Sequence, residues 1–134
     1  SAQPRYLDKR LLSSPAAALI QARKEVLRMA NMAREALEIS FNAFLNKDSK
    51  DLKKISEFED AIDSLQEKIT GYLVKISQQN LEKSQSKELP VWIHSVNDLE
   101  RIGDHAENLA ELTERAIRAK MEIQDEDCEL GGRN

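Results

Sequence analysis

The chain has few of the residues that make turns, cross-links or sheets. Its 134 residues include one cysteine, four glycines and three prolines, and aromatic residues make up 4%. A single cysteine, Cys128, excludes an internal disulfide and fits a reducing compartment. So few turn-forming and aromatic residues argue against a sheet-rich protein. What remains is the composition of long amphipathic helices.

Long hydrophobic runs and an excess of positive charge are also missing. No apolar run approaches the roughly 20 residues of a membrane-spanning helix, and the first residues lack the pattern of a secretion signal. We expect a soluble domain, which can still be cut from a longer membrane protein. The net charge of −4 and the pI near 5.3 argue against a nucleic-acid partner, because phosphate backbones are held by clustered Lys and Arg.

Hydrophobic periodicity predicts one all-α domain, an antiparallel three-helix bundle. We expect an extended N-terminal arm over residues 1–13, a helical domain over 14–123, and an acidic, glycine-containing, frayed tail over 124–134. Ser14 as N-cap and Pro15 at the first helical position mark a sharp start. The predicted helices span about 15–46, 49–80 and 87–122, and their short polar connections favour antiparallel neighbours.

Each predicted helix has one apolar face. The core face of the first is expected to be Leu19, Ala22, Val26, Met29, Ala33, Leu37, Phe41 and Phe44. The second has a heptad seam of Leu52, Ile55, Phe58, Ile62, Leu65, Ile69, Tyr72 and Ile76. The third continues through Trp92, Val96, Leu99, Gly103, Ala106, Ala110, Thr113, Ile117 and Met121. Its small residues would permit close helix contact, within the bundle or with a second copy.

Two acidic pairs occupy equivalent heptad positions on the second and third helices. Glu59 and Asp63 lie one turn apart beside the seam of one helix, and Glu100 and Asp104 have the same register on the other. Folding the chain back about a turn near Ser84 brings Asp63 and Asp104 to nearly the same height. Four carboxylates gathered there would suit a hard cation. Candidate outer ligands are Asn97 and Glu107.

A second interpretation of the same carboxylates is that they are solvated surface charge, which is the usual role of acidic residues on helix flanks. His94 and His105 are three turns apart and cannot chelate one ion together. We expect His105 to lie at the surface or to form a hydrogen bond with a metal ligand, rather than to bind the metal itself. No nucleophile motif, phosphate-binding glycine loop or zinc-spaced cysteine pair is present. The sequence gives no support for an enzyme.

The run VNDLERIGDHAEN at 96–108 resembles the signature of the PhoU family, phosphate-uptake regulators built from three-helix units. Residues 59–63, EDAID, match its partner motif, and the arm from Pro4 to Pro15 looks like the junction preceding the PhoU-like cytoplasmic domain of bacterial sodium/phosphate cotransporters. The resemblance covers the chain from Pro4 to about Met121. It implies metal binding through Glu59, Asp63, Glu100 and Asp104, with divalent or trivalent ions such as Fe, Zn, Ni, Mn or Mg as candidates.

The resemblance also implies a role and partners. The expected role is regulation of phosphate uptake at the cytoplasmic face of the cell membrane, on a transporter in cis or in trans. PhoU proteins have two three-helix halves, whereas this chain contains one, so we expect a homo-oligomer or pairing with a second half. The alternative function is a helical module for oligomerisation or partner binding that holds no metal.

Overall fold

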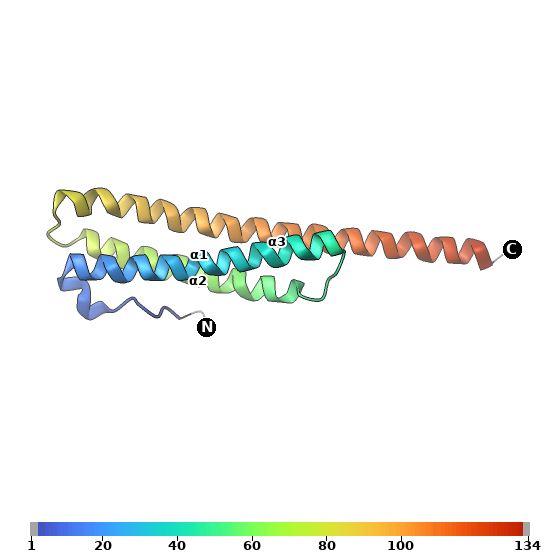
Figure 1. The fold of residues 1–134 in the computed structure, drawn as a ribbon, viewed down its shortest axis with the longest axis horizontal. Coiled ribbons are helices and arrows are strands. Elements are labelled where there is room, and N and C mark those ends of the chain that lie inside the picture. The colour runs from blue at the N-terminus through green and yellow to red at the C-terminus, as the bar shows by residue number, and fades with distance from the viewer. Residues whose placement is uncertain (1–2, 133–134) are drawn as a thin grey trace.

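The computed structural model describes residues 3–132 and is all-helical over its regular elements, as expected. A short 3₁₀ helix, η1 (Lys9–Ser13), precedes α1 (Pro15–Asn46), α2 (Leu52–Ser77) and α3 (Lys83–Gly132). The three long helices lie side by side and run up, down and up (Figure 1). The three-helix bundle predicted from hydrophobic periodicity is therefore confirmed.

The core face of α1 shifts along its length, and here the predicted stripe is wrong. Leu19 to Ala33 are buried as expected, but Phe41 and Phe44 are 51% and 42% exposed. Small residues replace them in the core: Ala36, Ser40 and Ala43. The hydroxyl of Ser40 donates to the backbone carbonyl of Ala106 at 2.7 Å. Small side chains allow this close approach of α1 and α3, so size outweighs hydrophobicity in this half of the bundle.

Helix α3 is longer at both ends than the predicted range of 87–122. It begins at Lys83, where the Gln85 side chain accepts a hydrogen bond from the Glu82 N–H at 2.9 Å and completes half of a capping box. Pro90, expected in the first turn, therefore lies inside the helix. At the other end the acidic segment is helical to Gly132, because Gln, Glu and Leu favour helix and no proline interrupts them. Residues 133–134 of the expected tail lie outside the described residues.

The far end of α3 projects beyond the bundle as a single helix (Figure 1). Thr113, 2% exposed, is its last buried residue within the described chain. Met121, expected in the core, is 58% exposed. It lies at the open end of the bundle, where it lines surface grooves with Leu45 at the end of α1 and Leu52 at the start of α2. Among the described residues, no helix is both long and apolar enough to cross a membrane.

The N-terminal arm is folded back on the bundle by a buried carboxylate on α1. Glu25 is fully buried, and its Oε1 accepts hydrogen bonds from the backbone N–H groups of Arg5 at 2.8 Å and Tyr6 at 2.9 Å. Arg28 forms an ion pair with its Oε2 at 3.0 Å, and the Tyr72 hydroxyl donates to the Asp8 carbonyl. The expected arm is thus packed against the helices from Gln3 onward, and residues 1–2 lie outside the described range.

Candidate metal centre

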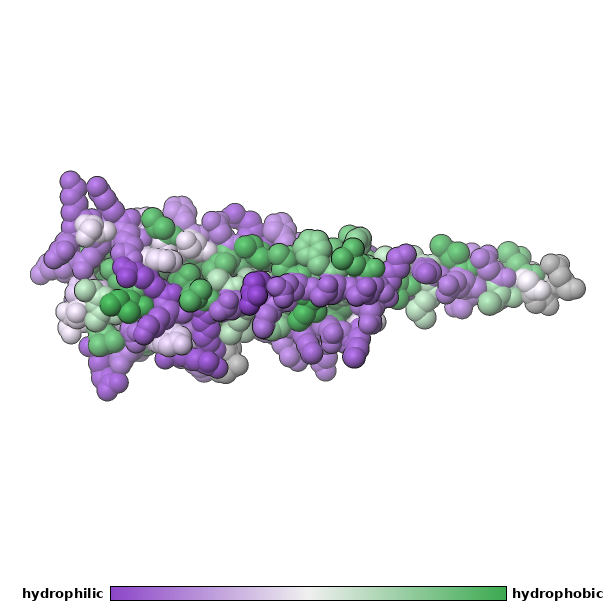
Figure 2. Space-filling view, viewed as in Figure 1, coloured by the Kyte–Doolittle hydropathy of each residue, from purple (hydrophilic) through white to green (hydrophobic). Residues whose placement is uncertain are grey.

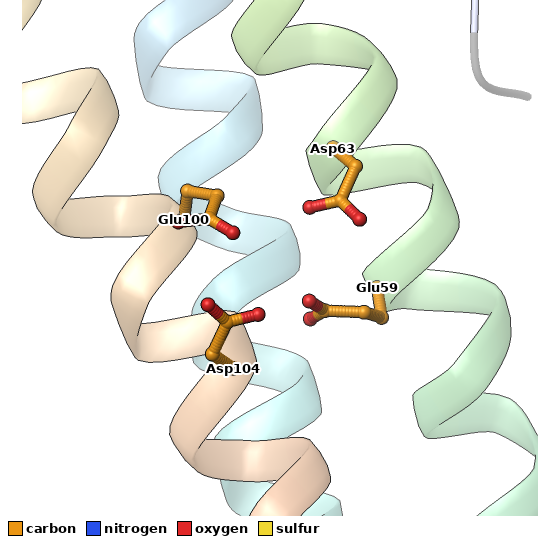
Figure 3. Close-up of side chains that lie close together, drawn as sticks. All are labelled: Glu59, Asp63, Glu100 and Asp104. Atoms are coloured by element: carbon orange, nitrogen blue, oxygen red, sulfur yellow. The ribbon is translucent and has the colours of Figure 1, made fainter.

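Helices α2 and α3 bring the four predicted carboxylates together. Glu59 and Asp63 project from α2 toward Glu100 and Asp104 on α3 (Figure 3). Each side chain offers one carboxylate oxygen, and these four oxygens all lie within 4.8 Å of one another. Because the two helices are antiparallel, residues that precede and follow the connecting loop by similar lengths meet at one height. We call these four residues the acidic cluster.

One oxygen of the acidic cluster has lost water without gaining a partner. Glu59 is only 7% exposed, and its Oε2 is buried with no hydrogen-bond partner in the structure. Within residues 3–132, none of the four carboxylates forms an ion pair with Lys, Arg or His. A buried carboxylate oxygen without compensation is costly. The described side chains therefore leave the negative charge of the cluster without a paired cation.

Gly103 makes room for this buried oxygen. A Cβ atom at position 103 would lie 2.8 Å from Glu59 Oε2 and 3.2 Å from Ile62 Cδ1. Only glycine lets Glu59 occupy its present position against α3. By contrast, a Cβ at Gly71 would meet nothing within 4 Å. The close approach of two helices therefore occurs at Gly103 and not at Gly71.

Burial and mutual repulsion raise the pKa values of the clustered carboxyls. Burial raises the pKa of Glu59 to about 8, and the neighbouring Asp104, Asp63 and Glu107 add to the shift. Burial also raises the pKa values of Asp63 and Glu100. The charge of Asp104 adds to the shift of Asp63, and a hydrogen bond with Asp104, followed by its charge, adds to that of Glu100. With a pKa of about 8, Glu59 is mostly protonated at neutral pH when no cation is bound.

The surroundings of the cluster are also acidic. The pKa of Glu107, a predicted outer ligand, is raised by burial and then by Glu111, Asp104, Asp63 and Asp60. Asp60 was not selected from the sequence, although its position next to Glu59 was a signal for it. Asn97, the other predicted outer ligand, accepts a hydrogen bond from Gln66 at 2.9 Å instead. His94 and His105 are exposed, and neither belongs to the cluster.

The donor set fits a hard cation. Two oxygens on opposite sides of an ion that binds them at about 2.0 to 2.6 Å lie roughly 4 to 5 Å apart, which the 4.8 Å limit of the cluster accommodates. All four donors are carboxylate oxygens, the ligands preferred by Mg²⁺, Mn²⁺ and Ca²⁺. A cation would give the orphaned Glu59 oxygen a partner and remove the repulsion that raises the carboxyl pKa values.

A family model and the similar proteins agree on one family. The PhoU domain matches residues 26–113, a range that contains the acidic cluster and ends at the last buried residue of α3. The chain is 36% identical over 90 residues to the phosphate-specific transport system accessory protein PhoU homolog 1 of Thermotoga maritima, covering 66% of this chain and 37% of that protein. The PhoU homolog of Clostridium acetobutylicum is 28% identical over 99 residues, covering 72% and 45%.

A second kind of relative matches more of the chain. The putative inorganic phosphate export protein YjbB of Escherichia coli K12 is 24% identical over 119 residues, which is 88% of this chain but 22% of that protein. The chain thus spans less than half the length of each of these relatives. No solved structure matches it significantly.

Proposed function

Because the chain belongs to the PhoU family, we propose that it is a regulatory domain of a phosphate transport system. Its matched relatives are named as accessory proteins of phosphate-specific transport and as putative inorganic phosphate exporters. Both names concern movement of inorganic phosphate across a membrane. The proposed partner is therefore a phosphate transporter, and the proposed place of action is the cytoplasmic face of the membrane. We assign no catalytic step to the domain.

We propose further that the acidic cluster binds a metal ion, which joins α2 to α3. The observation that supports this proposal best is the Glu59 Oε2 atom, which is buried and has no hydrogen-bond partner. Asp63, Glu100 and Asp104 place three more carboxylates around it. When bound, the cation supplies the positive charge that these groups lack. Divalent or trivalent Fe, Zn, Ni, Mn and Mg are the candidates, and the all-oxygen donor set favours the harder ions.

We propose that the domain acts in cis, as part of the same polypeptide as the transporter. Support comes from the YjbB match, which runs over 119 residues, whereas the Thermotoga match runs over 90. The longer match is expected if this chain is the cytoplasmic, PhoU-like part of a protein related to sodium-dependent phosphate cotransporters. A free-standing regulator that acts in trans is the second arrangement.

The competing function is a helical module that mediates contacts and binds no metal. It would leave the acidic cluster as ordinary solvated charge. The near-complete burial of Glu59 favours the metal-binding function, because glutamate side chains are rarely buried unless they are paired with a positive charge. The two functions differ in one measurable property, which is metal content.

Metal titration of chelator-treated protein tests the proposal. We expect saturable binding of Mn²⁺ or another of the candidate ions, measured by calorimetry and by metal analysis after dialysis. Glu59→Gln and Asp104→Asn should each weaken binding by about tenfold or more. The matched control is Asp98→Asn, which removes an exposed α3 carboxylate that pairs with Arg101, and it should bind as the parent does. Equal metal content in all variants, or none in the parent, contradicts the proposal.

A further inference from the structure

Helix α3 carries a second apolar stripe beside its core face. Taking Ala116, Ile123 and Leu130 as heptad position a places Leu112, Ala119 and Glu126 at position d. We call these six residues the outer seam. Leu112, Ile123 and Leu130 are 49%, 60% and 62% exposed, and Figure 2 shows hydrophobic residues at the surface of the projecting helix.

The outer seam is distinct from the core face of the same helix. The core face runs through Ala106, Ala110 and Thr113, and Ile117 continues it. At about 100° per residue, Ile123 lies on the order of 120° around the helix from Ile117. The two faces therefore point in different directions. Ala116, Ala119 and Ile123 of the outer seam line one groove with Phe44 and Leu45 at the end of α1, so a partner on the seam would also cover these two exposed side chains. The residues of the seam from Ala116 onward also lie outside the matched PhoU range.

We propose that the outer seam pairs antiparallel with the outer seam of a second copy of this chain. The first argument is the state of the isolated helix. After Thr113 no residue of α3 within the described chain is buried, whereas most helical stability in proteins comes from packing of an apolar face. A heptad seam is the pattern by which such a helix gains support from another helix.

Charge complementarity identifies the partner and its direction. The flanks of the seam carry Arg115, Glu122 and Glu129 at position g, and Lys120 and Asp127 at position e. In a parallel pair, position g contacts position e of the partner, which sets Arg115 against Lys120 and Glu122 against Asp127. Both contacts join like charges. In an antiparallel pair, position g contacts position g and position e contacts position e, which sets Arg115 against Glu129 twice by symmetry. Like charges then meet only at the symmetry axis, Glu122 with Glu122 and Lys120 with Lys120, whereas the parallel pair has four like-charge contacts and none between opposite charges.

The side chains of the seam also fit this direction. In the antiparallel register that sets Leu112 against Leu130 of the second copy, Ala119 meets Ile123. A small residue thus faces a large one, which maintains close packing. Ala116 meets Glu126, whose carboxylate lies next to Arg115 of the second copy. The one charged residue of the seam therefore has an opposite charge within reach.

This pairing places the two bundles at opposite ends of the paired helices. With a rise of about 1.5 Å per residue, the two Asp104 residues would lie roughly 50 Å apart along the axis. Each acidic cluster remains complete within its own chain. Self-association is therefore independent of metal binding, and the failure of either proposal does not affect the other.

Sedimentation equilibrium in the presence of a chelator tests the pairing. We expect reversible dimers between about 10 µM and 1 mM, and Arg115→Glu or Glu129→Lys should each weaken association by about tenfold. The double variant Arg115→Glu/Glu129→Lys should restore most of it, because the exchanged charges meet again across the antiparallel pair and the lysine at position 129 lies one turn from Glu126. Arg118→Glu, the same charge change at an exposed position outside the flanks, is the matched control and should leave association unchanged.

Cross-linking tests the direction separately. In a Cys128→Ser background, Leu130→Cys alone should give no covalent dimer with a short bis-maleimide, because the two thiols lie at opposite ends. Adding Leu112→Cys should give one, since positions 112 and 130 then meet. A particle that is monomeric up to about 1 mM, a double charge variant that stays as weak as the single ones, or cross-linking by Leu130→Cys alone would overturn the inference.

Discussion

Single atoms decide the character of the acidic cluster. Glu59 Oε2 has no partner because α3 approaches it at a position that carries no side chain, Gly103. The same approach expels water from Glu59 and raises its pKa to about 8. A single glycine thereby converts an ordinary helix-flank carboxylate into a buried group that favours either a proton or a cation.

Two of the helical glycines, Gly71 and Gly103, provide a matched pair of variants. Gly103→Ala should weaken metal binding by about tenfold or more, because the new Cβ displaces Glu59 Oε2. Its unfolding free energy should change little, since the Glu59 and Ile62 side-chain ends can move aside and alanine gains up to about 1 kcal/mol of helix propensity.

Gly71→Ala is the control for this variant. It meets no neighbouring atom within 4 Å, so we expect it to stabilise the protein by about 1 kcal/mol and leave metal affinity unchanged. Denaturant unfolding and metal titration of both variants check the pair. Equal metal affinity in the two alanine variants would show that the close approach at Gly103 has no role in the site.

Among the elements, the N-terminal arm depends most on one interaction. Glu25 holds two backbone N–H groups of the arm and pairs with Arg28 while fully buried. Such charge-assisted hydrogen bonds are stronger than those between neutral groups. They attach residues 5 and 6 to the middle of α1, and Tyr72 on α2 attaches the chain at Asp8. These contacts hold the arm against α1 and α2.

Glu25→Ala should release the arm. We expect the amide hydrogens of Arg5 and Tyr6 to exchange much faster, and the unfolding free energy to fall by about 1.5 to 3 kcal/mol because two charge-assisted hydrogen bonds and an ion pair are lost. Hydrogen exchange followed by mass spectrometry measures the release. Glu35→Ala, at an exposed position on the same helix, should leave the arm protected, and protection that persists in Glu25→Ala would contradict this account.

For the whole molecule, the acidic cluster links stability to pH and, under the proposed function, to metal. The pKa of Glu59 rises from its ordinary 4.5 to about 8 on folding, and those of Asp63, Glu100 and Glu107 rise too. A carboxyl whose pKa is raised on folding stabilises the folded state fully below its unfolded pKa, and this contribution is lost as pH rises through the folded pKa.

The metal-free protein should accordingly become less stable as pH rises from about 4.5 to about 8. Glu59→Gln should remove most of this dependence, because the amide does not titrate. A bound cation should reverse the slope, since it binds the deprotonated carboxylates, and should stabilise by about 2.7 kcal/mol at one hundred times its dissociation constant. Thermal unfolding with and without metal measures both slopes, and a parent curve as flat as that of Glu59→Gln would contradict the assignment.

Periodicity along the chain was sufficient to predict the fold and the four members of the acidic cluster. Apolar residues at steps of three and four determine which side of a helix is buried, because 3.6 residues make one turn. Glu59 and Asp63 have the same heptad register as Glu100 and Asp104, so their meeting followed from antiparallel helices. The acidic end of α3 was judged frayed from its charge, although its helix propensity was adequate to continue the helix.

Contacts between distant segments determined the rest. Which face of α1 turns inward after Ala33 depended on how closely α3 could approach, and Ser40 and Ala106 are 66 residues apart. Glu25 gave no signal in the sequence because its partners in the arm lie 19 and 20 residues away. The exposure of Glu59 could not be calculated before the position of Gly103 was known. Desolvation depends on which atoms replace water around a group, and those atoms come from other helices.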